Sequence, residues 1–91
     1  MSKKRDRLEV IYDLLNIIRN KNNSIKPTPL MRFCNLSSQS FEEYINELLE
    51  KKFIKELYDE NNRKHYTLTD KGFRFLEKYS TIIGFIEDFN L

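Results

Sequence analysis

Two stripes of apolar residues recur at helical spacing near the start of the chain, between about residues 6 and 20. The first stripe is Leu8, Ile11, Leu15 and Ile18, and the second is Val10, Leu14 and Ile17. The second lies on nearly the opposite side of the predicted helix from the first. Because a helix at the edge of a small domain needs only one apolar face, we expect this helix to be central in the domain or covered by a partner chain.

A short second helix is predicted after a polar, asparagine-rich loop. Thr28 is its expected N-cap, and Pro29 fits the first helical position, where the missing N–H costs nothing. Asn35, a residue that tolerates left-handed backbone geometry, is expected to end the helix.

The third helix follows at once, with Ser37 or Ser38 as its N-cap, and reaches about Lys52. Its apolar side chains lie on one face: Phe41, Ile45, Leu48 and Leu49. Two helices joined by three or four residues indicate a helix-turn-helix.

A hairpin and a last helix complete the predicted order. Two segments have the composition of strands, Phe53–Tyr58 and Lys64–Leu68. Between them, Asp59–Arg63 contains turn-forming asparagines. Thr69 or Asp70 then caps a helix over about residues 70–90, with Gly72 tolerated in its first turn.

The composition limits the chain to one domain. It has 91 residues, of which 40% are hydrophobic and 33% charged, so it has room for one core and carries too much charge for a membrane protein. We expect a flexible basic arm at residues 1–5, followed by a single α+β domain, mainly α, over residues 6–91.

Few residues offer catalytic or metal-binding chemistry. The chain has only two glycines, far apart, so no glycine-rich loop can surround a phosphate. One cysteine, Cys34, and one histidine, His65, are too few for a zinc site. We expect Cys34 to be a buried apolar side chain in a reducing, intracellular compartment. No serine or carboxylate stands at a recognised catalytic spacing from His65, so we expect no enzyme, no cofactor and no metal.

The charge is unevenly distributed, although the net charge is only +2. Residues 1–36 contain eight basic and three acidic residues, whereas residues 37–91 contain eight basic and eleven acidic residues. The first part therefore carries +5 and the second −3. This asymmetry is compatible with a polyanionic partner and equally with a solvated basic face.

The order of helix, helix, helix, hairpin and helix is typical of a winged helix. Here the sequence resembles the small archaeal winged-helix transcription regulators. The matching segments are Arg5–Asp13, Asn35–Ser37, Tyr44, Leu48–Lys51, Phe53–Ile54, Leu68–Gly72, Phe75–Leu76 and Tyr79. The resemblance implies a winged helix-turn-helix fold with a two-stranded wing, DNA binding, and dimerisation through a long last helix. Lys52 stands where the family usually has a glycine.

By this analogy, the exposed face of the third helix would meet the major groove of DNA. The candidate residues are Ser38, Gln39, Ser40, Glu43 and Asn46. Glutamine and asparagine can bond adenine through two atoms, and a serine at a helix start can meet a phosphate. Four glutamates give this helix a charge of −2, which opposes binding to phosphates. Either only its first turn enters the groove, or this face is not for DNA.

Three basic residues follow the hairpin turn directly: Arg63, Lys64 and His65. At a projecting tip they would contact the phosphate backbone or enter a minor groove. An exposed hairpin also needs charge merely to stay soluble, which is the alternative interpretation.

The last helix carries a possible dimer seam. Large apolar residues follow at intervals of four and three: Phe75, Tyr79, Ile82, Ile86 and Phe89. Ile83 widens this apolar side, while Phe73 and Phe85 point away from it. Leaving three aromatic rings in water would cost about 10 kcal/mol. The pattern therefore predicts a homodimer through this helix, the alternative being packing on its own domain.

Taken together, these features predict a homodimeric regulator that binds double-stranded DNA, in the cytoplasm and associated with the nucleoid. The alternative is a winged helix that serves as a protein–protein adaptor in transcription or chromatin machinery, which the acidic third helix keeps open. Glu87 and Asp88 disfavour membrane association through the last helix.

Overall fold

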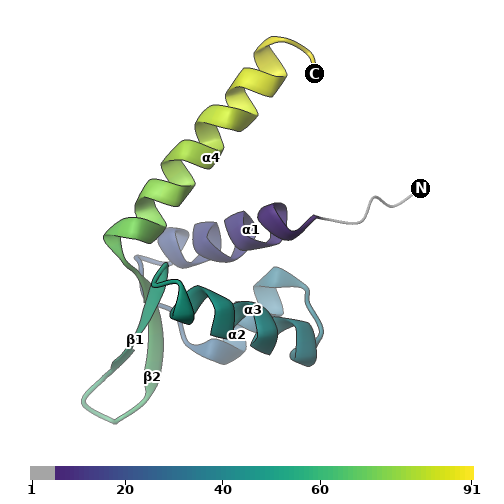
Figure 1. Ribbon diagram of the computed structural model, residues 1–91. Coiled ribbons are helices and arrows are strands. Elements are labelled where there is room, and N and C mark those ends of the chain that lie inside the picture. The colour runs from purple at the N-terminus through teal and green to yellow at the C-terminus, as the bar shows by residue number, and fades with distance from the viewer. Residues whose placement is uncertain (1–5) are drawn as a thin grey trace.

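The computed structural model describes residues 6–91 and contains the elements in the predicted order (Figure 1). Four helices and one hairpin follow one another as α1 (Arg7–Asn20), α2 (Pro27–Cys34), α3 (Ser38–Glu50), β1 (Ile54–Tyr58), β2 (Lys64–Leu68) and α4 (Asp70–Asp88). The predicted basic arm, residues 1–5, lies outside the described residues. No described helix is long and apolar enough to cross a membrane.

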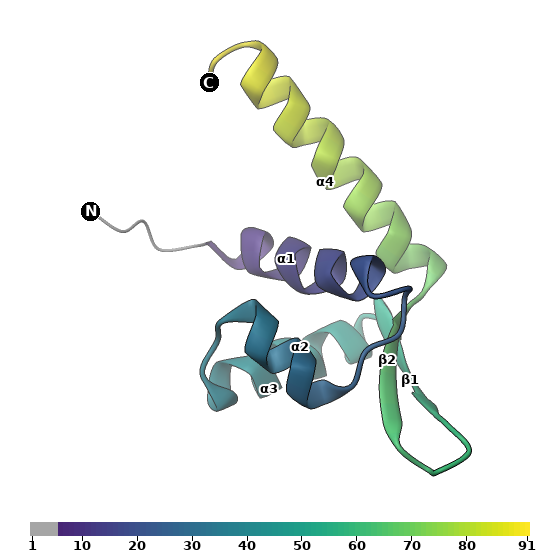
Figure 2. The ribbon, with the colours of Figure 1, turned by 180° about the vertical axis from the view of Figure 1, so that it is seen from behind.

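Helix α1 is the central element, which accounts for its two apolar stripes. It contacts α2, α4 and β2, and Figures 1 and 2 show it between α4 on one side and the α2–α3 pair on the other. Leu14, Leu15 and Ile18 have no exposed surface. Of the two expectations for this helix, the central position is confirmed, while Leu8 in its first turn remains half exposed.

Helix α2 begins two residues earlier than predicted. Pro27 is its first residue, and Lys26 is an N-cap with extended backbone and no side-chain cap. The prediction that Thr28 caps the helix and Pro29 starts it is wrong, because Pro27 already fits the first helical position and leaves Pro29 in the first turn, where no N–H is needed. Asn35 ends the helix in left-handed geometry, φ 57°, as predicted.

Helix α3 is capped by the Ser37 side chain, which accepts a hydrogen bond from Ser40 N at 3.2 Å. The helix ends at Glu50, slightly before the predicted Lys52. Lys52 instead takes the left-handed conformation, φ 63°, at the position where the resembled family has a glycine. Its neighbour Phe53 donates from N to the Leu48 carbonyl at 2.9 Å, so the helix closes with a Schellman turn.

Strands β1 and β2 pair antiparallel from Ile54 opposite Leu68 to Tyr58 opposite Lys64. A single bridge between Ile25 and Tyr66 joins the loop before α2 to the outer side of β2. The hairpin projects away from the helices and forms the wing (Figure 2).

Helix α4 is capped by Thr69 and packs on the domain as far as Tyr79, which stacks on Tyr12 of α1. Its start is fixed at Gly72, where a Cβ atom would lie 2.3 Å from the Phe53 carbonyl oxygen. The prediction that Gly72 is only tolerated is therefore wrong, since the close approach of Phe53, which directly precedes β1, requires a residue without a side chain. Beyond this point the far half of α4 extends from the body of the molecule (Figure 1).

Candidate nucleic-acid interface

The outward face of α3 carries the polar residues that the helical spacing places there. Gln39, Glu43 and Asn46 are exposed, whereas Phe41, Ile45 and Leu48 are buried on the opposite face. Of the two candidate serines, Ser38 is exposed and Ser40 is half-buried. The free polar side chains of this face can donate and accept hydrogen bonds at a base edge.

Part of the acidic charge on α3 is compensated within the chain. The Glu47 carboxylate pairs with Arg7 of α1 and with Lys51 at 3.0 Å. Glu42, Glu43 and Glu50 are exposed. The negative charge of the helix is therefore concentrated on its solvent face.

The tip of the wing is built around Asp59. Its Oδ1 accepts hydrogen bonds from the backbone N–H groups of Asn61 and Arg63, each at 2.9 Å. Together with a hydrogen bond from His65, these N–H groups hold the pKa of Asp59 below its ordinary value. Asn62 takes positive φ to complete the turn. The turn fixes the backbone at Arg63 and leaves its side chain exposed.

Lys64 faces α3 across a groove of about 310 Å³. Ser38 and Asn46 line this groove from α3, and Glu56 and Tyr66 line it from the wing. The Lys64 Nζ atom lies 3.3 Å from Glu56 Oε2, and Tyr66 and Glu56 together raise the pKa of Lys64. The structure thus brings together three of the predicted residues: Ser38, Asn46 and Lys64.

His65 does not join them. Side chains alternate along a strand, so His65 lies on the opposite face of the wing from Lys64 and Tyr66. Its Nε2 lies 3.0 Å from Asp59 Oδ2, and its Nδ1 lies 3.2 Å from the hydroxyl of Ser24. Both ring nitrogens are used to connect the wing tip to the loop before α2, which is a structural role.

Tyr58 is a surface residue that the sequence reasoning did not single out. It pairs with Lys64 across the hairpin and is 59% exposed. Directly opposed residues share one face of a sheet, so Tyr58 stands beside Lys64 on the side facing α3. The sequence contained a signal for it, because an aromatic residue stands at the end of the first strand, next to the basic tip of the hairpin.

The predicted dimer seam on α4 is divided into two parts. Phe75 and Tyr79 pack within the chain, with Tyr79 stacked on Tyr12 at 4.8 Å between ring centroids and Phe75 edge-on to Phe53 at 5.4 Å. The remaining apolar residues are exposed: Ile82, Ile83, Ile86 and Phe89. Phe85, which was expected to point away from the seam, contacts the Phe89 ring at 4.8 Å. We call these five residues the distal patch.

Comparison with known proteins identifies a family and a fold. The family model described as winged helix-turn-helix matches residues 4–87. The uncharacterized protein MJ0290 of Methanocaldococcus jannaschii is 35% identical over 85 residues, which are 93% of this chain. The chain spans only 37% of the length of that relative.

Two solved structures support the same fold. Sso10a-2, a DNA-binding protein from Sulfolobus solfataricus, has a TM-score of 0.75 and 21% identity, covering 94% of this chain and 86% of its own. F93 from STIV, a winged-helix DNA-binding protein, has a TM-score of 0.74 and 19% identity, covering 88% and 91%. At these identities the likeness concerns the fold, and it confirms the predicted winged helix-turn-helix with a two-stranded wing.

Proposed function

Because this chain belongs to the winged helix-turn-helix family, we propose that it is a transcription regulator that binds double-stranded DNA and has no enzymatic activity. The observation that carries this proposal is the shared surface of α3 and the wing, where Ser38, Asn46 and Lys64 surround one groove. Sso10a-2 and F93, which have the same fold, are described as DNA-binding proteins. The fold that they share with this chain supports DNA as the partner.

In this proposal the N-terminal half of α3 enters the major groove. Gln39 would bond the edge of an adenine, and Ser38 would meet a phosphate near the helix start. Glu43 would accept a hydrogen bond from a cytosine amino group. Glu50, at the far end of the helix, would remain outside the groove, because a carboxylate among phosphates lowers affinity.

The wing would hold the neighbouring phosphates through Arg63 and Lys64. The exposed Arg63 is available to a phosphate as it stands, whereas Lys64 must exchange Glu56 for its new partner. Tyr58 would lie against the sugar–phosphate backbone beside Lys64.

We further propose that the protein acts as a homodimer joined through the distal patch, and that it is an archaeal protein, which the match to the Methanocaldococcus jannaschii relative supports. A DNA-bound regulator would be found with the nucleoid.

Selection of binding sites from random double-stranded DNA tests the central proposal. Enrichment of one sequence supports it, and absence of any binding at 50 mM salt contradicts it.

Replacing both Arg63 and Lys64 by alanine is expected to flatten the dependence of log K on log salt concentration by about two, if each residue neutralises one phosphate. Fluorescence anisotropy with labelled DNA over a salt series measures this slope. Lys55→Ala is the matched control, because Lys55 lies on the other face of the wing and is exposed. An unchanged slope in the double variant would remove the wing from the interface.

Gln39→Ala is expected to relax the preference at one base position by about 1 to 3 kcal/mol without changing the stability of the fold, because Gln39 is exposed. Competition assays with single-base variants of the selected site measure this preference. Equal weakening on every DNA sequence would show that Gln39 only positions the helix.

A second function is favoured by one observation, the carboxylates of Glu42, Glu43 and Glu50 on the solvent face of α3. Such a face suits a basic protein surface better than DNA. In that case α3 would be the recognition surface of a protein–protein adaptor. Charge reversal of Glu42 and Glu50 to lysine, with Glu43 kept, separates the two functions, since it would strengthen DNA binding and weaken binding to a basic protein.

A further inference from the structure

A cleft of about 390 Å³ opens between α1 and α4, on the other side of α1 from α2 and α3. Residues from the first half of α1 form one wall, and residues from the middle and far half of α4 form the other. Its volume lies within the range of about 300 to 1,000 Å³ that is usual for small-molecule sites. The cleft plays no part in the DNA-binding surface proposed above, and Ile83 is the residue that it shares with the distal patch.

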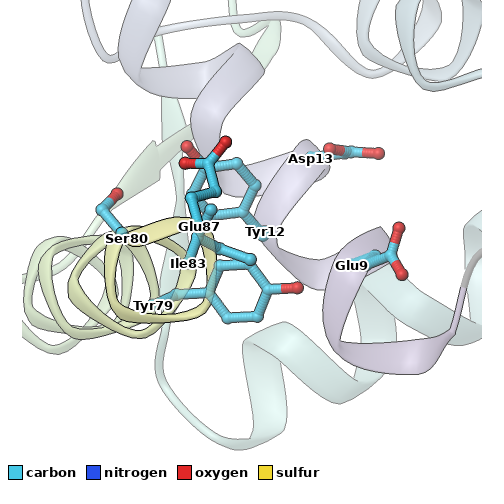
Figure 3. Close-up of a pocket in the computed structure, with 8 residues that line it drawn as sticks. Glu9, Tyr12, Asp13, Tyr79, Ser80, Ile83 and Glu87 are labelled. Carbon is cyan, nitrogen blue, oxygen red and sulfur yellow. The ribbon is translucent and has the colours of Figure 1, made fainter. Parts of the chain in front are cut away.

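Two aromatic rings form the inner wall of this cleft. Tyr12 of α1 and Tyr79 of α4 stack with their centroids 4.8 Å apart and their planes inclined by 27°. Figure 3 shows the two rings side by side between the helices, with Ile83 next to them. The stack connects the helices, and Tyr79 also stacks on Phe75 with the ring centroids 5.8 Å apart. Tyr12, Tyr79 and Ile83 line the cleft, where a ligand would meet aromatic and aliphatic surface.

The charged residues that line this cleft, among those that the structure describes, are acidic. Glu9 and Asp13 line the cleft from α1, and Glu87 lines it from α4. None of the described residues that line the cleft is basic. Partial burial raises the pKa of Tyr79, and the carboxylates of Asp6, Glu9 and Asp13 raise it further. The ring is therefore neutral and lies in the negative field of α1.

We propose that this cleft binds a small organic cation, namely an aryl- or alkyl-substituted ammonium compound. Aromatic faces attract a desolvated ammonium group through their quadrupole, and carboxylates supply the opposite charge. Ile83 and the tyrosine rings would receive the apolar part of the compound. An anion would meet carboxylates of its own charge, and a strongly hydrated metal ion would gain nothing from the aromatic and aliphatic surface. The negative charge and the apolar surface together therefore define the class of ligand.

Gly84 provides a way to close the cleft without damaging the fold. It lines the cleft, and a Cβ atom there would have nothing within 4 Å. Gly84→Leu therefore adds an apolar side chain to the wall and also removes a glycine from a helix, which increases helix stability. Gly84→Ala is the matched variant that makes the same helix change with little added bulk.

The test is a titration of the full chain with benzyltrimethylammonium, followed by NMR on the Tyr12 and Tyr79 rings and the Ile83 methyl groups. We expect saturable shifts at these groups and much weaker binding of neopentylbenzene, the uncharged isostere. Tyr79→Leu is expected to weaken cation binding about fivefold. The Glu9→Gln, Glu87→Gln double variant is expected to weaken it at least fivefold. Glu77→Gln, which changes a charge elsewhere on α4, should leave it unchanged.

Gly84→Leu should abolish the saturable shifts while raising the melting temperature, and Gly84→Ala should retain them. Equal binding of the uncharged isostere, or shifts that never saturate and spread over the surface, would overturn the proposal. So would resonances of the cleft that respond to protein concentration and not to the cation, because a second copy of the chain would then occupy it. None of these outcomes depends on DNA binding.

Discussion

Replacing Gly72 by alanine is expected to destabilise the protein by about 3 kcal/mol, a large share of the roughly 5 to 15 kcal/mol that stabilises a small domain. The added Cβ would lie 2.3 Å from the carbonyl oxygen of Phe53. That oxygen cannot simply move away, because it accepts hydrogen bonds from the backbone N and the hydroxyl of Thr69, at 3.1 and 3.2 Å. The contact therefore links the start of β1 to the cap of α4.

Urea unfolding followed by circular dichroism measures the effect on stability. Gly84→Ala is the internal comparison, since nothing lies within 4 Å of its added Cβ. It should stabilise the protein by about 1 kcal/mol through helix propensity alone. If both alanine variants changed the free energy of unfolding in the same direction, the close contact between Gly72 and Phe53 would not be what requires a glycine at this position.

The order of the elements was predictable because each carries its own local signal. The stripes of α1 and α3 have helical period, Ser37 and Thr69 are caps, and Asn35 takes the left-handed position. The role of Gly72 was not predictable in this way. It arises from the approach of Phe53, just before β1, to the first turn of α4, and these two segments meet only in the folded chain.

The candidate interface was predictable on α3 and only in part on the wing. A step of 100° per residue places Gln39 and Asn46 opposite Phe41, and the structure has them exposed. On the wing, the alternation of side chains along a strand already separates Lys64 from His65. The partners of these residues, Glu56 for Lys64 and Ser24 for His65, follow from strand register and loop position, which no local pattern specifies.

The seam on α4 shows the limit of a periodic pattern. Heptad spacing shows which residues share a side of the helix, but not how far the domain covers that side. In the structure, Phe75 and Tyr79 meet side chains of the same chain, and Ile82, Ile86 and Phe89 meet none of the large core residues. The far half of the helix therefore offers a second copy the most exposed apolar surface, while Phe75 and Tyr79 are only partly covered within the chain.

Ile82→Glu is expected to convert the protein into a folded monomer and to lower its affinity for a two-site DNA by at least 100-fold. Ile82 is 54% exposed in the single chain, so the charge costs the isolated domain little. In a dimer it would be placed at the middle of the distal patch, where a buried carboxylate without a partner is unfavourable. Loss of the dimer removes the second set of DNA contacts.

A two-fold axis at the distal patch would place both copies of α3 on one side of the duplex. The half-sites should then be about 34 to 36 Å apart, or a multiple of that spacing. Sedimentation velocity measures the oligomeric state, and anisotropy with one and two half-sites measures the affinity. Thr81→Glu is the matched control, because Thr81 is exposed on α4 outside the distal patch, and it should leave both unchanged. A native protein that sediments as a monomer at micromolar concentration, with equal affinity for one and two half-sites, would contradict both the dimer and the spacing.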